Sequence, residues 1–327
     1  YRFQLGCRGN CAFCACGDGE HAALPPATAA SHVAALASAC GTPCFRFAHN
    51  AINQSREETA AFCRALIATD LPLRWLDCGR FSGLDEELLG LLRRAGAIRL
   101  IFGMETASPR LLGMTGKGVS PDQVSRLLKA ADRAGIWTGL EIIAGLPHER
   151  EEDIDATVRF LRAHRAFIDE YYLTPFKMRE NSRMQLDPER FGLENLAPDV
   201  RYARFSGGAL PCFHETLFRF SERGGLAWEE KSRQIWHAYR RLAREPGIPV
   251  HNRYSDYDHI QALCSCYSRH SDKRDVRVAY RRYRHHCRIR YLRYQLSRRR
   301  LARRCRELTG WRDLPHQLAY ALHRLRA

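Results

Sequence analysis

Short apolar runs alternate with stretches of helical period over the first two-thirds of the chain, and this alternation limits the fold more than any other feature. The expected strands cover residues 1–6, 44–48, 71–77, 97–102, 137–144 and 169–174. The expected helices between them cover residues 27–39, 55–69, 85–95, 121–134 and 151–164. Strands joined by crossover helices form a parallel sheet, open or closed into a barrel. We therefore predict an α/β fold.

The pattern changes after Pro175. Residues 176–225 carry Pro, Gly and Asn signals without a clear period, which is typical of a loop-rich segment. Helical patterns then cover residues 229–244, 256–267, 275–308 and 315–325. We predict two domains, a barrel over residues 1–195 and a mainly helical, strongly basic domain over residues 196–327 that covers the barrel mouth.

Composition excludes several classes of protein. With 45% hydrophobic and 27% charged residues among 327, the chain is globular, and no uncharged apolar run reaches the length of a membrane span. The segment 273–305 holds 14 Lys or Arg against one Asp, so it carries +13 of the net charge of +16. Thirteen cysteines, an odd number, without a visible signal peptide predict a reducing cytoplasm.

Three cysteines follow the first expected strand as C-x3-C-x2-C, at Cys7, Cys11 and Cys14. Thiolates hold iron–sulfur clusters, usually four at a time, so three would leave one metal position open to a ligand that is not protein. A tetrahedral zinc site is the alternative, with Cys16 or His21 as the fourth ligand.

These residues resemble the radical S-adenosylmethionine (SAM) superfamily, in which such a triplet has an aromatic residue, here Phe13, before its last cysteine. The segments 102–118, 140–149 and 173–192 are similar to that family's fourth, fifth and sixth strand regions, and especially to the branch with an upstream cobalamin-binding domain. The resemblance implies a partial (β/α)6 TIM-like barrel.

The resemblance also implies cofactors and their ligands. Cys7, Cys11 and Cys14 would hold a [4Fe–4S] cluster whose fourth iron is chelated by SAM. Reduction would then cleave SAM to methionine and a 5′-deoxyadenosyl radical. The implied SAM contacts are Phe13, Ile143 and Gly145 near the adenine, and Glu105 at the ribose or amino group.

Three of the implied SAM contacts have alternatives. Lys117 would pair with the SAM carboxylate or lie on the surface in solvent, and Glu105 could instead form a salt bridge at the barrel end. Where many family members have a Gly-Gly-Glu-Pro run after the second strand, this chain has residues 49–54. Asn50 or Asn53 would supply the polar contact to SAM there.

The implied activity is radical SAM catalysis, for methylation, cyclisation or rearrangement of a natural product or lipid. An electron donor such as flavodoxin or ferredoxin would serve it, and any cobalamin would be held by a domain outside this chain. A tRNA-modifying enzyme of the methylthiotransferase kind and a non-catalytic zinc-binding nucleic-acid module are the alternatives.

The basic helix expected within 273–305 leaves its own role open. Tyrosines and other apolar residues recur along it mostly at every third or fourth residue and could pack on the barrel beneath a solvated basic face. They are Val276, Tyr280, Tyr283, Cys287, Tyr291, Tyr294, Leu301 and Cys305. The same arginines and tyrosines could contact RNA, or dock an anionic lipid, an acidic partner or a leader peptide.

Overall fold

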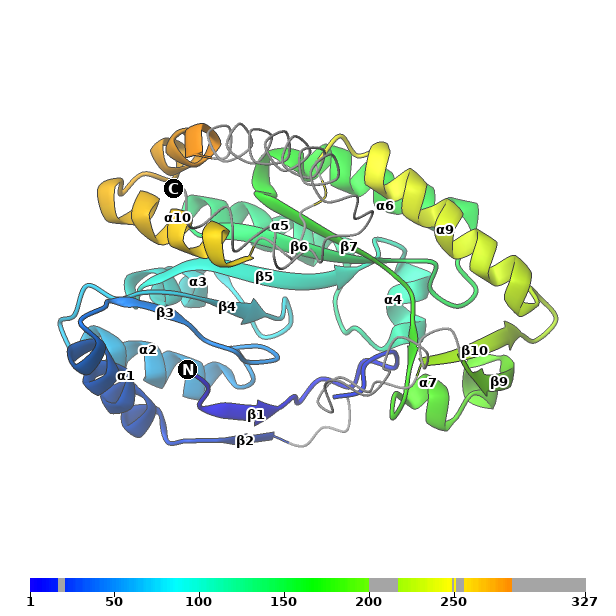
Figure 1. The fold of residues 1–327 in the computed structure, drawn as a ribbon, viewed down its shortest axis with the longest axis horizontal. Coiled ribbons are helices and arrows are strands. Elements are labelled where there is room, and N and C mark those ends of the chain that lie inside the picture. The colour runs from blue at the N-terminus through cyan, green and yellow to red at the C-terminus, as the bar shows by residue number, and fades with distance from the viewer. Residues whose placement is uncertain (17–20, 200–216, 249, 251–255, 284–327) are drawn as a thin grey trace, which may run out of the picture. The chain divides into compact units, whose positions relative to one another are not determined.

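A curled parallel sheet forms the centre of the computed structural model, which describes residues 1–16, 21–199, 217–248, 250 and 256–283 (Figure 1). Its strand order is β3-β4-β5-β6-β7, and every neighbouring pair is parallel. The strands are β3 (Cys44–Arg46), β4 (Arg74–Gly79), β5 (Ala97–Glu105), β6 (Trp137–Ala144) and β7 (Glu170–Pro175). This half-barrel confirms the predicted α/β class.

The first expected strand borders this sheet only in part. The backbone nitrogen of Tyr1 donates to Arg46 O at 2.9 Å, and Ala48 N donates to Tyr1 O at 3.2 Å. These two hydrogen bonds follow the pattern of parallel strands. Phe3 N then donates to the ring of His49 instead of to backbone, so the ladder stops. Strand β1 (Gln4–Gly6) pairs antiparallel with β2 (His21–Ala23) in a separate hairpin.

The predicted crossover helices cover one face of the sheet, and their apolar side chains form the main core with it (Figure 1). They are α1 (Pro26–Cys40), α2 (Arg56–Ile67), α3 (Glu86–Arg94), α5 (Pro121–Arg133) and α6 (Glu151–His164). Ser55, Asp85 and Ser120 cap three of these helices, each accepting a backbone N–H three residues on. The cap positions explain why sequence patterns located these helices well.

Several elements lie outside the strand–helix alternation. Helix α4 (Pro109–Thr115) follows β5, and an antiparallel sheet of order β8-β10-β9 forms where a loop-rich segment was expected. The remaining elements are β8 (Met178–Arg179), α7 (Arg183–Leu186), β9 (Leu193–Pro198), β10 (Leu217–Glu222), α9 (Trp228–Arg244) and α10 (Asp256–Arg269), with short 3-10 turns at Arg165–Phe167 and Glu189–Phe191. Residues 176–225 are thus more regular than the sequence indicated, in the part of that segment that the structure describes.

By its contacts the chain divides into two compact units, Tyr1–Ile260 and Gln261–Ala327. The domain boundary predicted at residue 195 falls inside β9 and stays a prediction from sequence. Residues 273–283 are helical, whereas the rest of the expected basic helix and the last expected helix lie outside the described residues. None of the helices in the described ranges is long and apolar enough to cross a bilayer.

A buried cluster of charged and polar side chains lies where β5 and β7 begin. Arg99 of β5 makes a bidentate ion pair with Glu170 of β7, at 2.8 Å for the shorter Nη2–Oε2 contact. Tyr172, Trp137 Nε1 and His259 complete the hydrogen bonds of that carboxylate. Although burial opposes ionisation, Arg99 and His259 hold the pKa of Glu170 well below its usual range.

Candidate active site

The cysteine loop lies directly after β1 and is anchored from two sides. Ala12, which is fully buried, donates its N–H to Thr115 O at the end of α4 over 2.8 Å and accepts from Met184 N of α7 over 3.0 Å. Within the loop, Cys14 N donates to Cys11 O at 3.1 Å. These contacts fix the loop at the carboxyl end of the sheet, where parallel barrels place their active groups.

The three thiols of this loop are half-buried, and two already accept backbone hydrogen bonds. Gly9 N donates to Cys7 Sγ at 3.3 Å, and Cys16 N donates to Cys14 Sγ at 3.4 Å. Burial raises the pKa of Cys11 and raises that of Cys14 to about 11, so both are thiols until a metal displaces the proton. Half-buried sulfurs with N–H donors fit an iron–sulfur cluster, which is held by thiolates and adjusted by such hydrogen bonds.

A single zinc ion fits this loop less well. In residues 1–16, 21–199 and the other described ranges, no three His, Cys, Asp or Glu side chains converge as the ligands of one ion. A cluster needs one thiolate for each of several irons, so its ligands need not converge on one point. Of the two residues predicted as the fourth zinc ligand, Cys16 is exposed, and His21 has both ring nitrogens engaged, with Gln4 Oε1 at 3.0 Å and Arg8 Nε at 3.4 Å.

Glu105 and Lys117 form a buried ion pair against the cysteine loop. Glu105 Oε1 and Lys117 Nζ lie 2.7 Å apart, with side chains 8% and 13% exposed. Lys117 Nζ also lies 5.7 Å from the centre of the Phe13 ring, within range of a cation–π contact. Burial by itself lowers the pKa of Lys117, but the Glu105 carboxylate together with the charges of Cys11 and Glu141 outweighs it, and the pKa is raised. Lys117 is therefore not the solvated surface lysine of the alternative above, and Phe13, Glu105 and Lys117 meet at one place.

The backbone around this ion pair is unusual. Glu105 has a φ of +70°, a left-handed conformation that non-glycine residues seldom adopt outside functional sites. A Cβ added at Gly103 would lie 2.3 Å from Glu105 Oε1 and 2.8 Å from Lys117 Nζ. The end of β5 thus makes room for the ion pair on the inner face of the sheet.

The polar segment after β3 supports the cysteine loop. Asn50, which is exposed, donates to Gly6 O at 3.1 Å, just before Cys7. Asn53 is buried and holds the turn after β4, donating to Arg80 O at 2.8 Å and accepting from Arg80 N at 2.8 Å. The side-chain amide of Asn53 is thus used in hydrogen bonds to the Arg80 backbone, whereas the side chain of Asn50 is exposed.

Arg80, which the sequence analysis did not single out, lies against the cysteine loop. A Cβ added at Gly9 would lie 3.2 Å from Arg80 Cζ and 3.1 Å from Cys7 Sγ. Its charge works against the burial that raises the pKa of the Cys11 thiol. Arg80 lies three residues beyond the expected strand 71–77 and directly after the observed β4, so a basic residue near the carboxyl end of a strand was the signal that could have identified it.

The last two predicted SAM contacts lie at the end of β6, which holds Ile143, and in the loop after it, which begins at Gly145. Ile143 is half-buried and packs on the same apolar cluster as Phe13. Gly145 has a φ of +82°, and a Cβ there would lie 2.5 Å from Ile235 Cγ1 of α9. The close approach of α9 therefore requires glycine at this position, and the contact of Gly145 with adenine stays a prediction.

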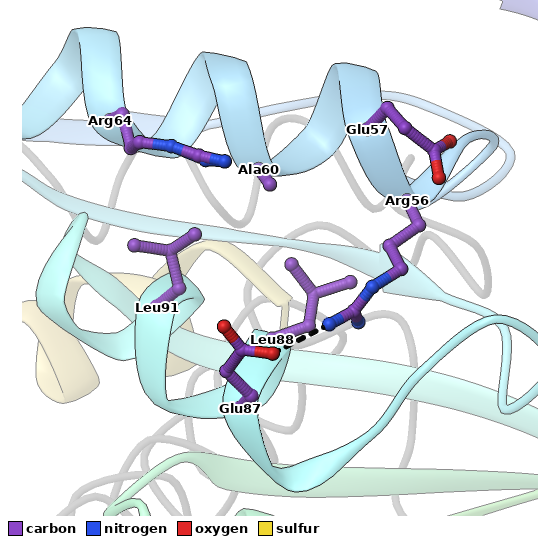
Figure 2. Close-up of a pocket in the computed structure, with 7 residues that line it drawn as sticks. All are labelled: Arg56, Glu57, Ala60, Arg64, Glu87, Leu88 and Leu91. Atoms are coloured by element: carbon purple, nitrogen blue, oxygen red, sulfur yellow. Dashed lines mark hydrogen bonds and ion pairs between the residues drawn. The ribbon is translucent and has the colours of Figure 1, made fainter.

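A cavity of about 170 Å³ lies between α2 and α3, on the helical layer (Figure 2). Arg56 at its edge pairs with Asp85 at 2.7 Å and Glu87 at 2.8 Å, so the cavity charges neutralise each other. None of its lining residues belongs to the cysteine loop or to the Glu105–Lys117 pair. This cavity is not the candidate active site.

Comparison with known proteins gives the family of this chain. Residues 1–161 match the family model of the radical SAM superfamily. An uncharacterized methyltransferase of Pyrococcus horikoshii is 32% identical over 92 residues, which are 28% of this chain and 20% of the relative. An anaerobic magnesium-protoporphyrin IX monomethyl ester cyclase of Rubrivivax gelatinosus is 28% identical over 164 residues, 49% of this chain and 30% of the relative. The chain therefore matches less than a third of either relative's length.

Solved structures share the fold. The radical SAM methyltransferase TsrM of Kitasatospora setae, solved with cobalamin and a [4Fe–4S] cluster, superposes with a TM-score of 0.59 at 18% identity, covering 87% of this chain and 60% of that one. The cobalamin-dependent radical SAM enzyme OxsB gives 0.54 at 12% identity, covering 88% and 45%. The match of residues 1–161 to the family model identifies the chain as a member of the radical SAM superfamily, and the curled parallel sheet with the cysteine triplet at its edge fits that family.

Proposed function

We propose that Cys7, Cys11 and Cys14 hold a [4Fe–4S] cluster. SAM would bind the open iron of this cluster, between the cysteine loop and the carboxyl ends of β5 and β6. The observation that carries this proposal is the meeting of Phe13, Lys117 and Glu105 beside the three thiols. When bound and reduced by an external donor, the cluster supplies the electron that cleaves SAM into methionine and a 5′-deoxyadenosyl radical.

The side chains at this place match the groups of SAM. The Lys117 ammonium would pair with the SAM carboxylate, and the Glu105 carboxylate would accept from the amino group or the ribose. Phe13 and Ile143 offer an apolar surface for the adenine, and Asn50 an exposed amide. Because Glu105 and Lys117 neutralise each other at 2.7 Å, a ligand with both charges can replace their contact without leaving either charge unpaired.

For the overall reaction we propose methylation or ring formation on a natural product or lipid. The printed names of the curated relatives, a methyltransferase and a cyclase, support these two reaction classes. The fold shared with TsrM and OxsB supports a cobalamin-associated enzyme, with the cobalamin held outside this chain. A reductant of the flavodoxin or ferredoxin kind would supply electrons.

The tRNA-modifying alternative rested on the basic segment 273–305, of which only residues 273–283 are described. No contact in the described part of the chain favours it, and it stays a prediction from sequence.

The test is anaerobic reconstitution with iron and sulfide, followed by reduction in the presence of SAM. We expect about four irons per chain and formation of 5′-deoxyadenosine, detected by mass spectrometry. Cys11→Ala should lose both, while Cys16→Ala, an exposed neighbour outside the triplet, should keep both. Equal iron content in Cys11→Ala and the unmodified protein would contradict the proposed ligands.

A further inference from the structure

The loop after β6, Gly145–Glu149, is held by residues that lie beyond the family-matched part of the chain. Lys231 Nζ of α9 donates to Leu146 O at 2.7 Å. His148 N donates to Glu222 Oε1 of β10 at 2.6 Å, and Gln234 Nε2 of α9 donates to Glu149 O. Inside the loop, Gly145 N donates to Glu149 Oε2 at 2.7 Å, so the loop backbone is held both by its own Glu149 and by side chains that residues 1–161 do not contain.

The face of α9 that meets this loop is defined by helical spacing. Lys231, Gln234 and Ile235 stand at i, i+3 and i+4, so they lie on the same face of the helix. Ile235 packs against Gly145 so closely that an added Cβ would lie 2.6 Å from Ile235 Cα. The helix therefore contacts the loop backbone directly and leaves it little freedom to move.

Lys231 is the centre of these contacts. Its side chain is fully buried, and Nζ donates to Leu146 O, to Gln234 Oε1 at 2.6 Å and to Glu222 Oε1 at 2.8 Å. An ammonium has three donors, so every one is used. A buried ion pair is a weak source of stability compared with apolar packing, but it specifies one arrangement of its partners. Here the arrangement specified is that of the Leu146 carbonyl relative to β10.

We propose that Lys231 is a positioning residue for SAM: by holding the Leu146 carbonyl it fixes the Ile143–Gly145 backbone against which the adenine binds. This inference rests on the proposed function, because it takes Ile143 and Gly145 as part of the SAM site. It means that α9 and β10 complete a site whose cluster ligands all lie within the first 14 residues.

The test compares Lys231→Met with Lys129→Met, which makes the same chemical change at an exposed lysine of α5. Both proteins are reconstituted anaerobically, their iron content is measured, and the SAM dissociation constant is measured by titration. We expect Lys231→Met to bind SAM about tenfold more weakly at unchanged iron content, the change that follows from loss of one charged hydrogen bond. Lys129→Met should bind as the unmodified protein does.

A double variant separates positioning from stability. Lys231→Met leaves the Glu222 carboxylate buried and unpaired, which lowers the unfolding midpoint. Adding Glu222→Gln removes that charge while its amide oxygen can still accept from His148 N, so the midpoint should recover. SAM binding should stay weak, since the Leu146 carbonyl still lacks the Lys231 ammonium and keeps only the Glu149 N–H at 3.1 Å.

The outcomes distinguish this inference from the proposed function. Recovery of SAM affinity together with the midpoint in the double variant, or unchanged affinity in Lys231→Met, would overturn the positioning role. Failure of the unmodified protein to bind SAM at full iron content would instead overturn the proposed SAM site itself.

Discussion

Replacing Gly145 with alanine tests whether α9 and the loop after β6 pack as tightly as the structure shows. The residue has a φ of +82°, where an L side chain is strained. An added Cβ would lie 2.5 Å from Ile235 Cγ1 and 2.6 Å from Ile235 Cα. Rotating the Ile235 side chain would relieve the first contact but not the second, because Cα belongs to the helix backbone. The helix or the loop must move.

The expected cost combines two effects. A left-handed backbone with a Cβ costs about 1–2 kcal/mol, and overpacking a closed contact costs about 1–3 kcal/mol. Gly145→Ala should therefore lower the free energy of unfolding by about 2–5 kcal/mol. Urea denaturation measures this value directly.

Two other glycines provide matched controls. Gly41 has a φ of +60° with nothing within 4 Å of an added Cβ, so Gly41→Ala isolates the strain at about 1–2 kcal/mol. Gly113 lies in α4 with open space around it, and Gly113→Ala should stabilise by about 0.5–1 kcal/mol. If Gly145→Ala cost no more than Gly41→Ala, the close packing of α9 on the loop would be refuted.

Three further predictions concern buried groups. Gly103→Ala would place a Cβ 2.3 Å from the Glu105 carboxylate, so this variant should bind SAM several-fold more weakly at unchanged iron content. Unchanged SAM affinity would argue against Glu105 as a SAM contact. Arg99→Met would leave Glu170 buried without its cation, which should cost about 3–5 kcal/mol in urea denaturation, whereas a cost below 1 kcal/mol would show that the pair is not buried as described. Burial raises the pKa of Glu149 from its ordinary value near 4.5 to about 7, so its proton stabilises the fold most below pH 4.5 and that contribution is lost as pH rises to about 7. Glu149→Gln should remove that part of the pH dependence, on the order of 3 kcal/mol between pH 4.5 and 7, and identical pH profiles would contradict the raised pKa.

The strands and helices of the barrel were predictable because each carries its own local signal. β6 and α6 have the bounds predicted from sequence, and Glu151, Glu152 and Asp153 in the first turn of α6 mark where that helix begins. The sheet β8-β10-β9 was missed because β8 is two residues long and because burial along β9 and β10 does not alternate strictly, so these strands lack the period-2 pattern that identifies a strand.

The residues of the candidate site divide in the same way, into those with a local sequence signal and those that only the fold brings there. The cysteine triplet is a local motif, so its residues were found directly, and Glu105 and Lys117 came from the resemblance of their segment. Arg80 and Lys231 reach the site only through the fold, from the end of β4 and from α9. Gly145 was identified through the resemblance, but only the structure shows that the closeness of Ile235 requires a glycine there.

The central claim is that an open iron of a cluster held by Cys7, Cys11 and Cys14 binds SAM. Electron paramagnetic resonance of the reconstituted, reduced protein tests this claim most directly, with and without SAM. We expect the signal of a reduced [4Fe–4S] cluster whose shape changes when SAM is added, and no such signal in Cys11→Ala. A cluster signal that SAM leaves unchanged, or a colourless protein that contains zinc in place of iron, would contradict the account.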